Sequence, residues 1–169
     1  MPRLCTIFRR PVEGDQPCLR SSISTPERAS SHYGRIVGIA WLYVGTRYGF
    51  GEKSARPLDG AHGVGKVRKI DCSGFVRNVY DEVFPEQGLS ARYDLNVATF
   101  RVVDLFEDVT EPQAGDIVCW DAHMGIVYNT ERKEFIHAPH TGDHVRIAEY
   151  GSGNWGGLPK MFRRWKNLQ

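Results

Sequence analysis

The sequence predicts an α+β fold in which helices come first and an antiparallel sheet follows. Apolar residues recur at helical spacing in the first half of the chain, and after residue 113 they alternate at period two in several short runs. At 169 residues the chain is long enough for one domain with its own core. We expect residues 1–30, which mix Pro, Ser, Arg and Glu without periodicity, to be a loosely packed arm. Residues 31–169 would form the domain.

Two helices are expected. The first starts near Tyr33 and is followed by Gly45 as a C-cap; its apolar face comprises Ile36, Val37, Ile39, Ala40, Tyr43 and Val44. The second starts near Cys72 and stops before Pro85, because proline disfavours helical backbone in the residue before it. Its stripe comprises Phe75, Val76, Val79, Tyr80 and Val83.

The second half predicts mainly strands. The stretch "ATFRVVDLF" (98–106) suits either a short helix or an extended segment. The expected strands lie in "DIVCW", "MGIVYN", "EFIHAP", "HVRIAEY" and "KMFRRW". We interpret the last, which is basic, as a solvated edge strand with two packed aromatic residues rather than a nucleic-acid patch.

The composition limits the possible classes of protein but does not indicate a binding partner. The formal net charge is only +2, and no run approaches the roughly 18 apolar residues that a membrane-spanning helix needs. The four cysteines include no C-x-x-C pair. We expect Cys119 to be a small buried apolar residue, and Cys5 and Cys18 to be free thiols.

The stretch "KIDCSGFV" sets Cys72 directly after Asp71, at the mouth of the second helix. A helix leaves its first amide groups unpaired, and these N–H groups with the positive end of the helix dipole stabilise a thiolate. We therefore expect a lowered pKa for Cys72 and amides able to donate to a developing oxyanion. The alternative is an ordinary N-cap motif in which the cysteine has no catalytic role.

A nucleophilic thiol needs a base, and the base needs a group that orients it. The sequence puts His123 at the start of one expected strand and His137 inside the next. If the two strands form a hairpin, both imidazoles project from the same face of the sheet, together with Phe135. Ile136 and Ala138 then face the other way.

Five ordered motifs now resemble a known family. In sequence order, "GTRYGFG", "DCSGFV", "PQAGDIVCW", "HMGIVYN" and "FIHAPHTGDHVRIAEY" are similar to the motifs of the NlpC-type (NlpC/p60 superfamily), papain-like cysteine peptidases that cut bacterial cell-wall peptides. The resemblance covers about residues 33–165. It implies a papain-like fold with N-terminal helices packed on a five- to six-stranded antiparallel sheet.

The resemblance also implies roles. Cys72 would be the nucleophile, His123 the general base, and His137 the third polar residue that holds the imidazole in its productive tautomer. Tyr48 would line the site and help to polarise the scissile carbonyl.

Asp71 and Ser73 match positions that, in members cutting near a free peptide N-terminus, help to hold its amine. The chain departs from the family pattern at Glu52, where a second glycine is usual, and in its long basic segment from Lys53 to Ile70.

The function implied is that of a cysteine hydrolase, a peptidoglycan endopeptidase or amidase acting on stem peptides. The favoured bond joins D-glutamate, through its side chain, to the diamino acid. No metal or organic cofactor is implied, and we expect a monomer with no nucleic-acid partner and no membrane insertion. Two alternatives stay open: a papain-like amidase or acyltransferase with a non-wall substrate, and a catalytically silent wall-binding or assembly module.

The N-terminal stretch "MPRLCTIFRRPVEGDQPCLR" has too short an apolar core for a convincing secretory signal. We therefore expect a protein made in the bacterial cytoplasm and delivered to the periplasm or cell wall by another route. A phage-associated lysin or an interbacterial toxin exported by a type VI-like machine would fit. A toxin would imply an immunity protein in the producer.

Two other motifs are weak evidence, one for a nucleotide-binding loop and one for a zinc site. "GAHGVGKV" (60–67) spells G-x-x-x-x-G-K but continues with Val67, where a phosphate loop needs Ser or Thr. His137 and His140 lie three apart, which on a strand puts them on opposite faces and makes poor spacing for a zinc site.

Overall fold

The computed structural model describes residues 25–53 and 69–166, and it confirms the predicted α+β class. Its helices are α1 (Thr25–Leu42), α2 (Cys72–Val83), the 3₁₀ turn η1 (Pro85–Gln87), α3 (Leu89–Arg92), α4 (Val97–Phe100) and α5 (Gly153–Gly156). Its strands are β1 (Phe106–Val109), β2 (Ile117–Cys119), β3 (Met124–Asn129), β4 (Glu134–His137), β5 (Arg146–Glu149) and β6 (Met161–Trp165). They form one antiparallel sheet in the order β1-β6-β2-β3-β4-β5. Cys5, Cys18 and the segment "GAHGVGKV" lie outside the described residues.

The first helix is longer than the sequence pattern predicts, since α1 begins at Thr25 rather than near Tyr33. On the predicted apolar face, Ile36 and Ala40 are fully buried in the core. Gly45 follows the helix with a φ of 90°, a conformation that glycine adopts without steric penalty. Its amide donates to the carbonyl of Val145 at 2.8 Å, which fixes the chain where it leaves the helix.

The second helix forms where the sequence predicts it. Asp71 is the N-cap, and its carboxylate accepts a hydrogen bond of 2.6 Å from the backbone N–H of Gly74. The predicted apolar stripe is buried, and η1 begins at Pro85. Because the cap directly precedes Cys72, the residues that start the helix also place the thiol on its first turn.

The stretch for which helix and strand were both open contains both. The helix α4 ends at Phe100, and β1 begins at Phe106. This additional strand changes the position of β6, which pairs with β1 on one side and β2 on the other. The prediction that β6 is an edge strand is therefore wrong.

The basic residues of β6 are engaged inside the protein. Arg163 is buried and forms an ion pair with Asp108 at 3.0 Å. Arg164 forms an ion pair with Asp116 at 2.8 Å. These two guanidinium groups are therefore occupied by carboxylates of the same chain, which disfavours a nucleic-acid patch on this strand.

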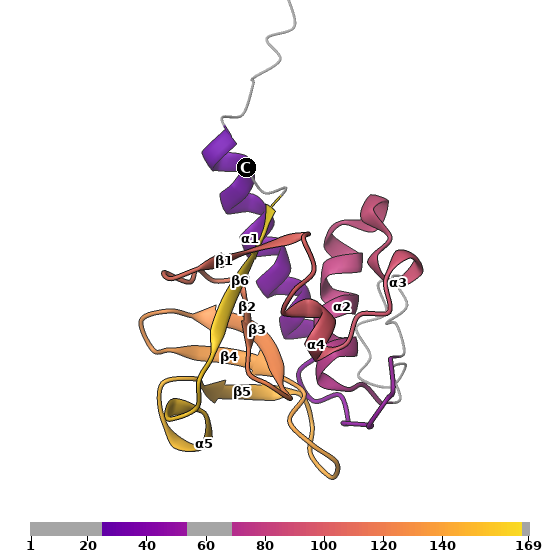
Figure 1. Ribbon diagram of the computed structural model, residues 1–169, viewed down its shortest axis with the longest axis vertical. Coiled ribbons are helices and arrows are strands. Elements are labelled where there is room, and N and C mark those ends of the chain that lie inside the picture. Colours follow the sequence, from indigo (N-terminus) through magenta and orange to yellow (C-terminus); the bar gives the residue numbers. More distant parts are fainter. Residues whose placement is uncertain (1–24, 54–68, 167–169) are drawn as a thin grey trace, which may run out of the picture.

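A core lies on each face of the sheet. Helices α1 and α2 pack together on one face, where both contact β3 (Figure 1). A smaller aromatic cluster, next to α5, covers the other face. As alternation along β4 predicts, Phe135 belongs to the aromatic cluster, whereas Ile136 and Ala138 belong to the larger core. Among the described residues, no helix has the length and apolar character to cross a membrane.

Candidate active site

Cys72 is the first residue of α2 and lies where the helix meets the start of β3. Its side chain is largely buried, with 8% of the residue exposed. The backbone N–H groups of Met124 and Ser73 lie near enough to the sulfur to lower the pKa of the thiol. Met124 is the first residue of β3, so the thiol lies beside the residue that follows His123.

The electrostatics of Cys72 differ from the sequence-based expectation. Burial raises the pKa of the thiol to about 11, and the neighbouring Asp71 carboxylate adds to the rise. The two backbone N–H groups and the Lys53 ammonium lower the pKa, but they do not offset burial. The prediction of a lowered pKa is therefore wrong. The resting thiol is protonated at neutral pH, so catalysis requires a base.

A tight turn places His123. Only Asp121 and Ala122 separate Trp120 from His123, and the Trp120 amide donates to the His123 carbonyl at 2.8 Å. This turn joins β2 to β3. His123 therefore directly precedes Met124, the residue of β3 whose backbone lies next to the Cys72 thiol.

His123 and His137 meet as the predicted hairpin requires. The strands β3 and β4 pair, and Nε2 of His123 lies 2.7 Å from Nδ1 of His137. If His123 donates this hydrogen bond, its Nδ1 keeps a lone pair and is free to accept a proton. Burial lowers the pKa of His123 to about 4 and that of His137 to about 3, so both imidazoles are neutral at pH 7.

Gly125 permits this close approach of β3 and β4. A Cβ atom there would lie 2.6 Å from the Ile136 carbonyl oxygen, 2.6 Å from the Phe135 ring and 3.0 Å from Cβ of His137. Only glycine fits without moving β4, so this position helps to set the separation of the two imidazoles.

An aromatic wall surrounds the two imidazoles. The Trp155 ring stacks on His123 with centroids 4.6 Å apart and meets His137 edge-on at 5.5 Å. Trp120 and Phe135 complete the wall. Trp155 comes from α5 and was not singled out in the sequence. Its one signal is a tryptophan isolated among glycines in "GSGNWGG".

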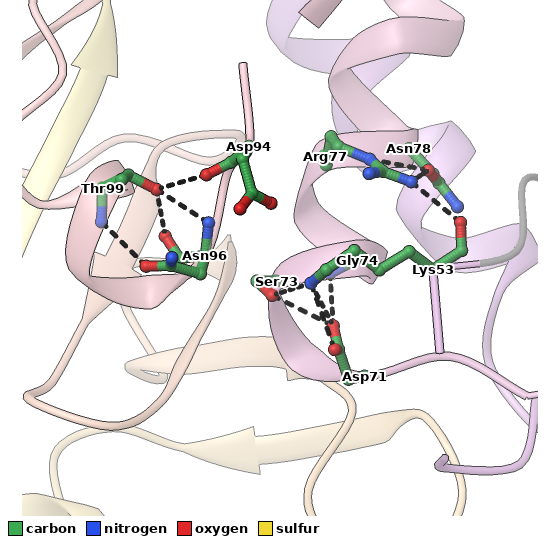
Figure 2. A network of polar contacts seen from close by, with 9 residues as sticks. All are labelled: Lys53, Asp71, Ser73, Gly74, Arg77, Asn78, Asp94, Asn96 and Thr99. Atoms are coloured by element: carbon green, nitrogen blue, oxygen red, sulfur yellow. Dashed lines mark hydrogen bonds and ion pairs between the residues drawn. The ribbon is translucent and has the colours of Figure 1, made fainter. Parts of the chain in front are cut away.

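A polar cluster lies at the start of α2 and includes the two sequence neighbours of Cys72, Asp71 and Ser73 (Figure 2). The Lys53 ammonium lies 3.1 Å from Oδ2 of Asp71 and donates to Oγ of Ser73 at 2.7 Å. The Ser73 hydroxyl also donates to Asp71 at 3.0 Å. Asp71 and Ser73 thus hold an ammonium group, and it is one that the chain itself supplies.

Tyr48 lies close enough to Cys72 and Asp71 to interact with both electrostatically. Burial raises the pKa of its hydroxyl, and the electrostatic interactions with Cys72 and Asp71 act in the same direction. Its amide donates to the Asp143 carbonyl at 2.8 Å. The structure therefore brings all six predicted site residues into one region, although their roles stay predictions.

The chain is similar to known proteins over most of its length. The model of the NlpC/P60 family matches residues 45–162, which include Tyr48, Cys72, His123 and His137. The chain belongs to the NlpC/P60 family. Protein P54 of Enterococcus faecium is 28% identical over 123 residues, which are 71% of this chain and 20% of P54. The chain therefore spans about a fifth of the length of this curated relative.

Solved structures share the NlpC/P60 fold. The NlpC/p60 domain of the peptidoglycan hydrolase SagA has a TM-score of 0.52 and 24% identity, with 76% of this chain and 96% of that domain covered. The peptidoglycan hydrolase RipB of Mycobacterium tuberculosis has a TM-score of 0.58 and 16% identity, with 90% and 73% covered. At these identities the likeness establishes the fold.

Two clefts adjoin the site of this NlpC/P60 domain. The first, of about 610 Å³, lies beside His123 and is mainly apolar; it includes Trp120, Pro139, Trp155, Leu158 and Pro159. The second, of about 350 Å³, lies beside Tyr48 and is more basic; it includes Arg47, Lys69, Asp143 and His144. The loop of residues 139–144 contributes to both.

His140 lies in this loop and not on a strand, because β4 ends at His137. The strand-face reason for separating His140 from His137 is therefore wrong. His140 is exposed, with its Nδ1 3.0 Å from the Thr141 carbonyl oxygen. Within residues 25–53 and 69–166, no group of three or more His, Cys, Asp and Glu side chains is arranged to hold a metal ion.

Proposed function

We propose that this protein is a cysteine hydrolase that cleaves amide bonds in the stem peptides of peptidoglycan. The observation that carries the proposal is the position of Cys72 on the first turn of α2, next to the backbone of Met124, which directly follows the His123 of the hydrogen-bonded pair His123–His137. The names of SagA and RipB as peptidoglycan hydrolases support the substrate class. The favoured bond joins D-glutamate, through its side chain, to the diamino acid.

In the proposed reaction, the Cys72 sulfur attacks the amide carbonyl while its proton passes to Nδ1 of His123. The C–N bond then breaks, His123 returns the proton to the leaving amine, and a thioester remains on Cys72. Water attacks the thioester with His123 as general base, which releases the acid and restores the thiol. The Tyr48 hydroxyl and a backbone N–H at the start of α2 are the proposed donors to the oxyanion.

The charge of the cleft beside Tyr48 supports a stem peptide as the substrate. A stem peptide carries carboxylates, including the α-carboxylate of the side-chain-linked D-glutamate. Arg47 and Lys69 line the cleft beside Tyr48, and both are exposed. We propose that these cations attract the acidic acyl part of the substrate, while the leaving part lies against His123.

We also propose that the enzyme acts in the periplasm or cell wall, because its substrate lies there. A phage-associated lysin and a delivered interbacterial toxin with an immunity protein in the producer are the proposed biological settings. Both involve the same chemistry at Cys72.

Digestion of purified peptidoglycan tests the proposed function directly. We expect mass spectrometry to find a new free amine on the diamino acid and a new terminal D-glutamate on the other fragment. Cleavage at another amide would refute the favoured bond, and intact peptidoglycan would refute the wall substrate. Transfer of the acyl group to an added amine, with no hydrolysis product, would identify an acyltransferase.

The pH dependence of kcat/KM should show that the imidazoles of His123 and His137 are neutral in the resting enzyme. His123 accepts a proton only when it is neutral, and its pKa is lowered to about 4. We therefore expect kcat/KM on a stem peptide to be flat from about pH 5 to about pH 9 and to fall as the pH drops through the His123 pKa. A fall in activity above about pH 8 would instead indicate a resting thiolate–imidazolium pair, which must lose its function when the imidazolium deprotonates.

Trp155 provides the matched variant for this profile. Trp155→Ala admits water to the His123 ring, so the pKa of His123 should rise toward its ordinary value and the acidic limb should move to higher pH. Trp155→Phe keeps an aromatic cover and should move the limb less. An unchanged acidic limb in Trp155→Ala would show that this residue does not shield the base.

A further inference from the structure

The backbone at Lys53 is hydrogen-bonded to the start of α2. The Asp71 amide donates to the Glu52 carbonyl at 2.8 Å, and Nη2 of Arg77 donates to the Lys53 carbonyl at 2.8 Å. Gly74 makes room for this segment, since a Cβ atom there would lie 3.1 Å from Cα of Lys53. The backbone of Lys53 is therefore attached to the same helix that carries Cys72.

The side chain of Lys53 completes a charge-neutral cluster. Its ammonium contacts both carboxylate oxygens of Asp71, at 3.1 and 3.4 Å, and the Ser73 hydroxyl at 2.7 Å (Figure 2). The Asp71 side chain is only 10% exposed, whereas that of Lys53 is 25% exposed. A carboxylate this buried needs a partner charge, and Lys53 supplies it.

This cluster lies where the acyl part of a substrate must pass. Asp71 and Ser73 flank the nucleophile in the sequence, and the charges of Asp71 and Lys53 both act on the Cys72 thiol. Because the leaving amine must face His123, the acyl part extends toward Asp71, Lys53 and Tyr48. An ammonium group on that part would meet a carboxylate that is already neutralised.

We infer that Lys53 is a specificity-determining residue that fills the ammonium site of Asp71 and Ser73. The substrate class is then a stem peptide whose N-terminus is acylated and uncharged, as it is when the peptide is attached to the glycan strand. A free N-terminal amine brings no gain in binding, because it competes with Lys53 for one carboxylate. The inference rests on the proposed function and adds to it the state of the substrate N-terminus.

Two stem peptides that differ only at the N-terminus test this inference. Each contains L-alanine, side-chain-linked D-glutamate and the diamino acid, and one carries a free amine while the other is N-acetylated. We expect the parent to have similar kcat/KM values on both or to prefer the acetylated peptide. In Lys53→Met the Asp71 carboxylate loses its partner, so the ratio of free to acetylated kcat/KM should rise about tenfold or more, equivalent to about 1.4 kcal/mol.

Two control variants separate charge from structure. Lys53→Arg keeps the cation and should keep the parent ratio. Lys53→Met with Asp71→Asn removes both charges while Asn still caps the helix, so the shift should disappear. The ratio cancels any loss of activity that affects both peptides equally, including a change in the thiol pKa.

The outcomes are distinct. A parent enzyme that prefers the free amine by about tenfold or more overturns the inference without any variant, as does an unchanged ratio in folded Lys53→Met. If Lys53→Met does not fold, the parent ratio still decides. Cleavage of neither peptide by the parent would refute the proposed function, and the inference with it.

Discussion

Cys72→Ala should abolish hydrolysis of stem peptides, with a loss of roughly 10⁴-fold or more in kcat, because no other group can form the thioester. The substitution removes one largely buried sulfur atom from the first turn of α2 and leaves the Asp71 cap intact. The variant should therefore fold and retain most of its affinity for the peptide. The measurements are the rate of product formation, the melting temperature and binding of a defined stem peptide.

Cys119→Ala is the matched control for this prediction. Cys119 is the other cysteine of the described residues, is 1% exposed, and has a pKa raised by burial to about 12. It belongs to the core and should tolerate alanine with a modest loss of stability and nearly full activity. If Cys72→Ala digests cell walls as fast as the parent, Cys72 is not the nucleophile.

The parts of the site that the sequence predicts well are those that depend on local patterns. Asp71 and Cys72 follow from capping and the start of an apolar stripe, and these features involve only neighbouring residues. The pairing of His123 with His137 follows from two adjacent strands joined by a short turn. Alternation along β4 then assigns Phe135 and His137 to one face.

The parts that were missed depend on contacts between distant segments. The position of β6 between β1 and β2 is a matter of strand order, which periodicity within a strand does not encode. The pKa of Cys72 was predicted in the wrong direction because the helix terminus is local, whereas burial by β3 is not. Trp155 reaches the site from α5, and neither spacing nor charge in the sequence marks it. Lys53 is the first residue of the basic segment that the sequence shows, but the sequence pattern does not indicate its contact with Asp71.

His123→Ala should reduce kcat by roughly 10²–10⁴-fold or more, since no alkyl side chain can accept the thiol proton. The thiol has a pKa of about 11, so few molecules would carry a spontaneous thiolate at neutral pH. Raising the pH should partly restore the rate of this variant, because hydroxide then removes the proton that His123 no longer accepts. The measurement is kcat on one stem peptide from neutral to alkaline pH.

The role of His137 is narrower, and its geometry predicts which substitution is tolerated. His137 contacts His123 through Nδ1, at 2.7 Å. In asparagine, Oδ1 is separated from Cα by the same number of bonds as Nδ1 of histidine, and it is a hydrogen-bond acceptor. His137→Asn should therefore retain much more activity than His137→Ala, whereas the longer His137→Gln should retain less than His137→Asn.

His140→Ala is the control for the two imidazoles, because His140 is exposed in the loop after β4 and its ring nitrogens contact Thr141 and Asp143 rather than either imidazole. It should retain most of the activity. The five rates are measured on the same stem peptide. If His140→Ala proves as damaging as His123→Ala while His137→Ala is harmless, the orienting residue is His140, and the short hydrogen bond between His123 and His137 has no part in catalysis.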